Sequence, residues 1–261
     1  MDGERRKIMV VGAGSGIGAA VATHFHERGD HVLAVDVRNQ QTPASQHAQC
    51  DLRDADSIRE LLDGVGAGWD MLAHVAGIPG TAPATDVLKV NYLGMRLMTE
   101  GMLPLLRQGG SVVAVASTAA LGWDQRLDVL AGLLEATDAE SVEEWQAGQD
   151  PDYPVYSSSK QAVILYAKRL AGPAMAKYGV RINTVSPGPV ETPILSDFEQ
   201  TMGKDVLDMV RSTVGRHGTV ADIVPVIAFL GSSAAQWING QDIHVDAGFI
   251  SSMTSGPPIQ L

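Results

Sequence analysis

Cysteine is nearly absent from this chain, which has only Cys50 among its 261 residues. A single thiol excludes an internal disulfide and a cysteine-rich zinc site, and the seven histidines are scattered. We therefore expect no metal. Long hydrophobic runs are also missing, because no stretch reaches the roughly 18–20 apolar residues that a membrane span requires. The first seven residues contain no apolar segment typical of a secretory signal, so we expect a cytoplasmic protein.

Positive charge is scarce as well. Lysine and arginine together number 19 against 30 acidic residues, which leaves a formal net charge of −11. Nucleic acids and anionic membranes attract basic surfaces, so we expect neither as a partner. With 45% hydrophobic residues, the chain is long enough to bury one sizeable core.

Segments typical of strands and of helices alternate along the whole sequence. This alternation predicts one α/β domain over residues 1–261, with a doubly wound, Rossmann-like parallel sheet of about seven strands flanked by helices. The expected strands are residues 7–12, 31–36, 47–50, 70–75, 111–117, 180–186 and 241–246. The expected helices lie near residues 17–28, 54–64, 86–107, 155–178 and 219–231.

One long segment, residues 124–153, interrupts this alternation and exceeds a usual strand–helix loop. Leucines recur in it at helical spacing, which predicts an inserted pair of amphipathic helices. Residues 127–159 contain eight acidic side chains and neither lysine nor arginine, so we expect a solvated acidic face. The insertion is interpreted either as decoration or as a lid or interface.

Glycines follow the first apolar strand and open the first helix, in the motif from Gly12 to Gly18. Glycine lets the backbone turn tightly and approach a pyrophosphate, while the new helix directs unpaired N–H groups toward it. The second strand ends in Asp36, 18 residues beyond Gly18. A carboxylate there can accept from both adenosine ribose hydroxyls and repels a 2′-phosphate, which favours NAD over NADP. Arg38 leaves phosphate acceptance open, and capping of a turn is the other interpretation of Asp36.

Two further pairs follow the third and fourth expected strands. Asp51 could accept from an adenine amine while Leu52 flanks the ring, although capping of the next helix explains Asp51 equally well. Ala76 and Gly77 allow close approach of the backbone to a ribose. The neighbours of His74 are apolar, so we interpret it as a packed strand residue rather than a base.

Tyr156 and Lys160 lie four residues apart, on one face of an expected helix. None of the other four tyrosines has a lysine at that offset. An ammonium beside a phenol favours phenolate and could lower the pKa of Tyr156 from about 10 toward neutrality. Such a phenol can exchange a proton with a carbinol or carbonyl oxygen. A simple surface pair is the alternative.

Two polar residues lie where they could take part in this proton exchange. Ser117 ends the fifth expected strand, at the sheet edge where doubly wound folds hold ligands, and its hydroxyl could hold the substrate oxygen. Asn91 lies among apolar residues inside the long helix expected over 86–107. It is either a satisfied core amide or a residue that fixes a helix kink and a water.

All these features, followed by the segment 183–188, occur in an order that resembles the short-chain dehydrogenase/reductase superfamily over almost the whole chain. The resemblance implies that Tyr156 is the general acid/base, that Lys160 lowers its pKa and binds the nicotinamide ribose, and that Ser117 orients the substrate. It also implies that Asn91 holds the water of a proton relay. By the same resemblance the pyrophosphate is lined by Gly12, Ser15, Gly16, Ile17 and Gly18, and the nicotinamide by Pro187, Gly188, Val190 and Thr192.

The sequence departs from the family pattern at Val11, at His74-Val75, where paired asparagines are usual, and at Ala247. The 39-residue gap from Ser117 to Tyr156 resembles bacterial 3α-hydroxysteroid dehydrogenase/carbonyl reductases and coniferyl-alcohol-type dehydrogenases, which also carry a helical insertion. The family implies a homodimer or homotetramer. An insertion at the start of the Tyr-Lys helix could block one contact and leave an interface near residues 219–246.

The expected substrate loop, residues 189–213, offers apolar side chains at Pro189, Val190, Ile194, Leu195, Phe198 and Met202, and Lys204 is its only basic residue before Arg211. An apolar pocket suits a bulky hydrophobic secondary alcohol or its ketone, such as a 3α-hydroxysteroid or a similar cyclic or aryl compound. The sequence thus predicts an NAD(H)-dependent oxidoreductase. Within the same fold the alternative is an aryl-alcohol (coniferyl-type) dehydrogenase or a broad carbonyl reductase. From a different class, the alternative is a non-catalytic NAD-binding regulator.

Overall fold

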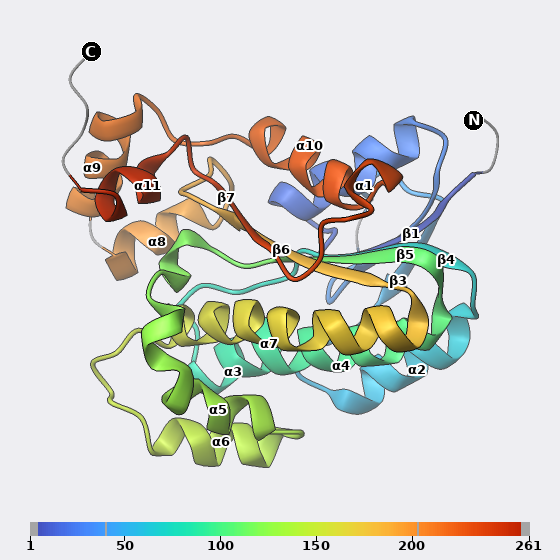
Figure 1. Cartoon of the computed structure of the whole chain (residues 1–261), viewed down its shortest axis with the longest axis horizontal. Coiled ribbons are helices and arrows are strands. Elements are labelled where there is room, and N and C mark those ends of the chain that lie inside the picture. The colour runs from blue at the N-terminus through green and yellow to red at the C-terminus, as the bar shows by residue number, and fades with distance from the viewer. Residues whose placement is uncertain (1–4, 40, 203, 257–261) are drawn as a thin grey trace.

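The structure, a computed structural model, describes residues 5–39, 41–202 and 204–256; the predicted domain range 1–261 and loop 189–213 thus extend over a few residues outside this description. Within the described ranges, seven strands form one parallel sheet in the order β3-β2-β1-β4-β5-β6-β7 (Figure 1). The strands are β1 (Lys7–Val11), β2 (His31–Asp36), β3 (Gln46–Gln49), β4 (Trp69–His74), β5 (Leu106–Val115), β6 (Arg181–Pro187) and β7 (Asp242–Val245). The predicted doubly wound α/β fold is confirmed.

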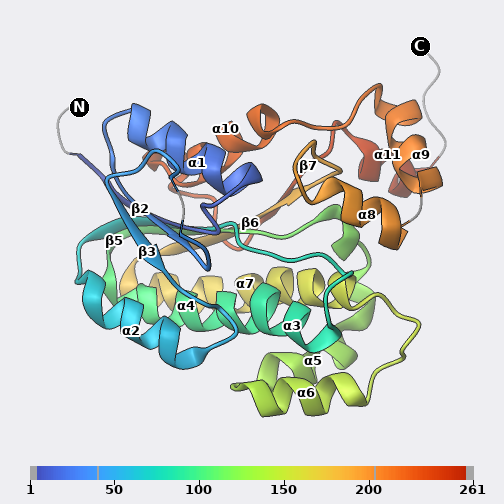
Figure 2. The same ribbon diagram turned by 180° about the vertical axis from the view of Figure 1, so that it is seen from behind.

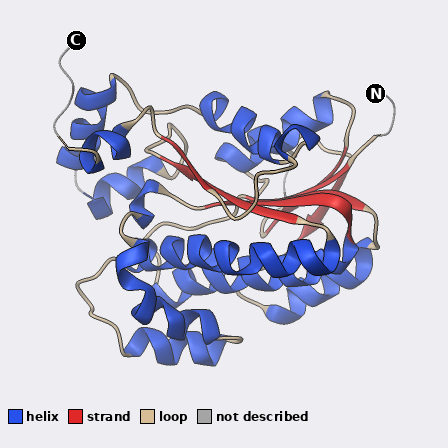
Figure 3. Ribbon diagram, in the orientation of Figure 1, coloured by secondary structure: helices blue, strands red, loops and turns tan. Residues whose placement is uncertain are grey.

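Helices cover both faces of the sheet, which Figure 3 shows as a single red layer. One face carries α1 (Gly16–Glu27) and α10 (Val220–Leu230); the other carries α2 (Ala55–Val65), α4 (Met95–Met102) and α7 (Val155–Tyr178) (Figures 1 and 2). Side chains alternate along each strand, so Val10 packs in the core under α1 while Met9 packs in the core under α4 and α7. Chain order reverses between β2-β1 and β4-β5, and the carboxyl ends of β1 and β4 therefore border a crevice.

The helix predicted over 86–107 is divided into four segments. They are α3 (Ala84–Leu88), a π-helical turn η1 (Lys89–Gly94), α4, and a short 3-10 turn η2 (Leu103–Leu105). A π-turn opens the regular ladder of backbone hydrogen bonds, as predicted for a kink at Asn91. Pro104 lacks an N–H and helps to end the helix, and β5 begins at Leu106 rather than at residue 111. Its start was hidden because Gly109 and Gly110 resemble a turn.

The segment over 124–153 contains the two expected helices, α5 (Leu127–Glu135) and α6 (Ala139–Ala147). Leu130, Leu133 and Val142 pack on the outer side of α7 and η1 (Figure 1). Arg96 donates to the carbonyl oxygens of Leu134 and Ala136, at 2.7 and 2.8 Å. The insertion is therefore fixed to the body of the fold by an apolar core and by a half-buried cation.

Several short elements lie around the carboxyl ends of the strands. They are η3 (Thr118–Ala120), η4 (Trp123–Arg126), α8 (Leu195–Met202), α9 (Lys204–Val214) and α11 (Phe249–Thr254). The short turn η5 (Ser233–Ala235) lies instead near the amino end of β6, where Arg181 donates to the carbonyl oxygen of Ser232. The sequence analysis predicted a loop over 189–213 and did not identify α8 and α9. Within the described part of the chain, none of the helices has the length and apolarity to cross a membrane.

Candidate active site

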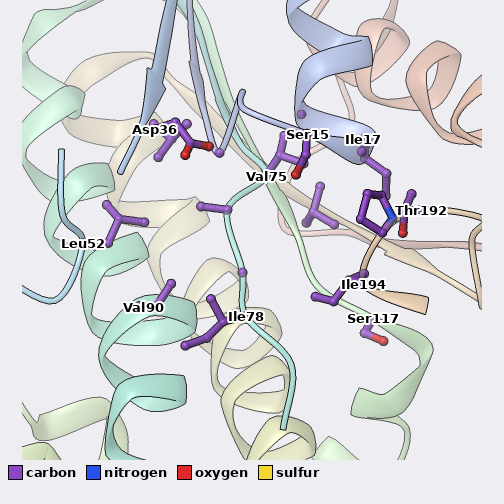
Figure 4. Close-up of a pocket in the computed structure, with 18 of the residues that line it drawn as sticks. Ser15, Ile17, Asp36, Leu52, Val75, Ile78, Val90, Ser117, Thr192 and Ile194 are labelled. Carbon is purple, nitrogen blue, oxygen red and sulfur yellow. The ribbon is translucent and has the colours of Figure 1, made fainter. Parts of the chain in front are cut away.

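A cavity of about 550 Å³ lies along the carboxyl ends of the central strands. Figure 4 shows Asp36 and Leu52 toward one end, and Ser117, Thr192 and Ile194 toward the other. Every residue that the sequence analysis assigned to the cofactor or to catalysis lines this cavity, apart from Asn91. The cofactor-type and catalytic residues therefore share one site.

The glycine turn forms the floor of the cavity between β1 and α1. Gly12 has a φ of +86°, and an added Cβ would lie 2.5 Å from the backbone of Ala76. At Gly18 an added Cβ would collide with the carbonyl oxygen of Gly12. The cap residue Ser15 makes no side-chain capping bond to α1, so its hydroxyl and the first N–H groups of the helix face the cavity. The turn fits a pyrophosphate, because an anion is favoured at such a helix end.

Asp36 ends β2 with a nearly buried carboxylate, whose side chain is 9% exposed. The backbone N–H of Gly14 donates to Oδ2 at 2.8 Å, and that of Arg38 donates to Oδ1 at 3.1 Å. An added Cβ at Gly14 would lie 2.6 Å from Oδ2. Gly14 is therefore a residue of the site that the sequence analysis did not assign, and the signal was its place inside the glycine motif.

The capping interpretation of Asp51 is wrong, because Asp54 caps α2 by accepting from the N–H of Asp56. Asp51 instead pairs with Arg53, whose Nη2 lies 2.7 Å from Oδ2. This guanidinium lowers the pKa of the Asp51 carboxyl. The carboxylate lines the cavity and remains available to an adenine amine.

Apolar side chains complete the two walls near Asp51. The residues on these walls are Leu52, Val75, Ile78 and Val90 (Figure 4). Sequence reasoning identified Leu52 and missed the other three. Val75 and Ile78 flank the assigned pair Ala76-Gly77, whereas Val90 lies in the π-turn, so its orientation could not be predicted from helical periodicity.

Asn91 lies behind the cavity wall and is 1% exposed. Its Oδ1 accepts from the N–H of Ile78 at 2.8 Å, and its Nδ2 donates to the carbonyl oxygen of Ile78 and to Oγ of Ser159, both at 3.1 Å. The amide thus connects the loop after β4 to α7. Both alternatives from the sequence apply in part, since Asn91 is a satisfied core amide and also lies in a helix irregularity.

Tyr156, Ser117 and Lys160 meet where β5 ends against the first turns of α7. The Ser117 hydroxyl bonds to the phenol of Tyr156, which lowers its pKa, but burial has the larger effect and raises that pKa to about 12. Lys160 Nζ lies 5.8 Å from the Tyr156 ring centroid and donates to the carbonyl oxygen of Val115 at 2.9 Å. The expected lowering of the Tyr156 pKa by Lys160 is therefore wrong for this state of the protein. Burial also lowers the pKa of Lys160 to about 8.

Gly77, in the loop after β4, lies beside Lys160 and Asn91. An added Cβ there would lie 3.1 Å from Lys160 Nζ and 3.3 Å from Asn91 Oδ1. Glycine is thus needed at this position, because a side chain would displace the amine.

The substrate end of the cavity is bordered by the segment after β6. Pro187, Gly188, Val190 and Thr192 line it, as predicted for the nicotinamide side. The ring of Phe198, on α8, packs edge-on against Tyr156 with centroids 5.1 Å apart.

A hydrogen bond connects α8 to the loop after β4. The hydroxyl of Thr81 donates to Asp197 Oδ1 at 3.2 Å. Helix α8 therefore packs against the ring of Tyr156, and we call it the lid helix.

Comparisons with known proteins agree with this geometry. A family described as "short chain dehydrogenase" matches residues 6–125, and one described as "Enoyl-(Acyl carrier protein) reductase" matches residues 145–250. The chain is 32% identical to coniferyl-alcohol dehydrogenase of Pseudomonas sp. strain HR199, over 95% of this chain and 97% of the relative. It is 31% identical to 3-alpha-hydroxysteroid dehydrogenase/carbonyl reductase of Comamonas testosteroni, over 94% of this chain and 97% of the relative.

A solved structure is also similar over nearly the whole chain. The 3-alpha-hydroxysteroid dehydrogenase from Pseudomonas sp. B-0831, crystallised with NADH, superimposes with a TM-score of 0.83 and 30% identity, covering 97% of this chain and all of that one. Fold, cavity and relatives lead to one conclusion: the chain belongs to the short-chain dehydrogenase/reductase family of oxidoreductases.

Proposed function

We propose that this chain is an NAD-dependent dehydrogenase that interconverts a hydrophobic secondary alcohol and its ketone. The proposal rests on the interaction between the Ser117 hydroxyl and the Tyr156 phenol. Both residues line the cavity whose floor is the glycine turn. A group able to exchange a proton with a carbinol oxygen thus lies in the same cavity as a pyrophosphate-binding turn.

The residues fit a dinucleotide, and Asp36 supports NAD in particular. Its carboxylate is held toward the cavity by two backbone N–H groups, where it can accept from the ribose hydroxyls and repel a 2′-phosphate. Asp51 and Leu52 would border the adenine, Gly12, Ser15, Gly16, Ile17 and Gly18 the pyrophosphate, and Ala76 and Gly77 a ribose. Pro187, Gly188, Val190 and Thr192 would border the nicotinamide, which supplies or accepts hydride when bound.

In this mechanism Tyr156 is the general acid/base. It takes the hydroxyl proton of the alcohol in oxidation and donates a proton to the carbonyl oxygen in reduction. Ser117 holds that oxygen beside the phenol. Lys160 must bring its positive charge toward the phenol in the working state, since at 5.8 Å from the ring centroid it does not offset burial. Asn91 lies in the π-turn, where opened backbone hydrogen bonds can hold the water of a proton relay.

The substrate end favours a ring-containing hydrophobic compound. Phe198, Ile194 and Pro193 line it, and the aromatic ring of Phe198 beside Tyr156 supports a substrate that carries a ring. A 3α-hydroxysteroid or a similar cyclic or aryl alcohol suits this wall, in line with the hydroxysteroid dehydrogenases among the relatives. The second candidate is an aryl-alcohol (coniferyl-type) dehydrogenase or a broad carbonyl reductase, favoured by the 32% identity to coniferyl-alcohol dehydrogenase.

We expect a cytoplasmic homodimer that associates through the region 219–246. The inserted helices α5 and α6 cover the outer side of α7, which supports an interface elsewhere. Phe229 at the end of α10 is 44% exposed, and Trp237 is 96% exposed. Sedimentation of the wild-type protein and of Trp237→Ser tests this assignment, because a tetramer paired across α5 and α6 contradicts it.

The test of the function is a steady-state assay with NAD and NADP against steroids, aryl alcohols and cyclic ketones. We expect turnover with NAD and a ring alcohol. Binding of NAD with no absorbance change for any alcohol would instead support a non-catalytic regulator.

A further inference from the structure

His74, the last residue of β4, is a buried polar side chain that the proposed mechanism does not use. It is 2% exposed, and its Nε2 has no hydrogen-bond partner among the residues that the structure describes. A buried acceptor or donor without a partner reduces the stability of the fold by about 1–3 kcal/mol. A nitrogen in this condition therefore needs an explanation, such as a functional role.

The strand register places His74 on the face of the sheet that α4 and α7 cover. It aligns with Val11 of β1 and Ala114 of β5, and side chains of aligned residues in a parallel sheet point to the same face. Val11 packs in the core under α4 and α7, so His74 points to the side from which Lys160 approaches.

Lys160 reaches the sheet beside this position. Its Nζ donates to the carbonyl oxygen of Val115, the residue after Ala114, and an added Cβ at Gly77 would lie 3.1 Å from it. An ammonium has three N–H donors, and the carbonyl of Val115 is the one acceptor found for them among the described residues. A buried cation with spare donors thus lies near an imidazole with a spare nitrogen.

We propose that His74 is a positioning residue for Lys160, and that its Nε2 accepts a hydrogen bond from the Lys160 ammonium, directly or through one buried water, when the cofactor is bound. This inference rests on the proposed function. It explains how the amine keeps its charge in a buried layer, since a hydrogen bond to the charged form favours that form. It also assigns the imidazole the tautomer with its proton on Nδ1.

The charges around His74 are consistent with an acceptor. Burial, followed by the positive charge of Lys160, lowers the pKa of His74 to about 3, so the ring is neutral in the working range. Lys160 is the charged side chain whose field acts on it. Two other titratable groups on the surrounding elements, Tyr156 on α7 and Tyr92 on η1, remain neutral phenols because burial raises the pKa of each to about 12.

The experiment compares His74→Leu, His74→Asn and the control Met71→Leu. The leucine removes the acceptor, the asparagine restores one through its amide oxygen, and Met71 lies on the same strand but packs in the opposite core. NAD affinity and kcat/KM are measured from about pH 6 to about pH 10, the range that spans the ordinary and lowered values of a buried amine.

We expect the alkaline loss of NAD affinity and of kcat/KM to move by about one pH unit toward acid in His74→Leu, because the amine loses a bond to its charged form. His74→Asn and Met71→Leu should keep the wild-type profile. A folded His74→Leu protein with a wild-type profile overturns the inference, as does a control that shifts equally.

A second measurement avoids dependence on the folding of His74→Leu. In the wild-type protein with 15N-labelled histidine, Nε2 of His74 should give the signal of an unprotonated nitrogen, and that signal should move when Lys160 is replaced by Met in the NADH-bound state. A protonated Nε2, or a signal that ignores Lys160, refutes the assignment. Failure of the wild type to turn over any alcohol refutes the proposed function, whereas NAD affinity and this titration still test His74.

Discussion

The two ends of the cavity are built in different ways. At the dinucleotide end the surface consists of backbone and strand ends, with Gly12 against Ala76 and the N–H of Gly14 bonded to Asp36. At the substrate end the surface consists of side chains from the segment after β6, together with Phe198 on α8, which contacts Tyr156. One end is therefore determined by the sheet itself, and the other by a helical lid whose side chains can change without disturbing the fold.

The largest effect should come from Tyr156→Phe, which lies at the boundary between the two ends. Loss of the proton-exchanging hydroxyl should lower kcat by at least about 10³-fold. NAD affinity, set at the other end, should stay within about twofold. Steady-state assays measure kcat, and fluorescence titration with NADH measures the cofactor affinity. Equal losses in both would show that the ends are not independent.

Asp36→Ala should have the next largest effect, and that effect should be confined to the dinucleotide end. Removing a carboxylate that accepts from two backbone N–H groups should reduce the preference for NAD over NADP about 10-fold to 100-fold, the equivalent of a hydrogen bond to a charged group. The ratio of kcat/KM values for the two cofactors provides the measurement. Substrate KM at saturating NAD is the control and should not change.

Phe198→Ala tests the substrate end alone. Loss of the ring should raise KM for a cyclic ketone about 5-fold to 10-fold, as expected for one aromatic contact, with NAD affinity preserved. The control Met209→Ala truncates an exposed side chain on the neighbouring helix α9 and should have little effect. A KM that falls in Phe198→Ala would mean that the ring obstructs the substrate rather than holding it.

The smallest expected effect is the pH dependence of NAD affinity. Because burial lowers the pKa of Lys160 to about 8, its ammonium is present below that pH and is lost above it. NAD affinity should therefore fall about 2-fold to 5-fold as the pH rises through 8, and Lys160→Met should abolish this dependence. Calorimetric titration at several pH values would detect it, and a flat wild-type profile would show that the amine does not bind the ribose.

Most of the dinucleotide end could be predicted from the sequence because its requirements are local. A glycine turn, an acid at a strand end and a short Ala-Gly pair each follow from backbone geometry within a few residues. Helices α8 and α9 were missed although their apolar residues recur at helical spacing, such as Leu195 and Phe198 in α8 and Leu207 and Val210 in α9. Their segment follows several prolines, and its apolar residues were interpreted as the lining of a substrate loop rather than as helix faces. The Tyr156 pKa was also missed, because burial by α8 depends on a contact between distant segments.

The bond between Gly14 and Asp36 has a consequence for coenzyme engineering. A designer who replaces Asp36 to admit a phosphate also leaves the N–H of Gly14 without its acceptor, and a larger side chain at position 14 would have to displace the original carboxylate. Positions 14 and 36 must therefore be redesigned as a pair, and libraries that randomise either one alone would sample mostly compromised binders.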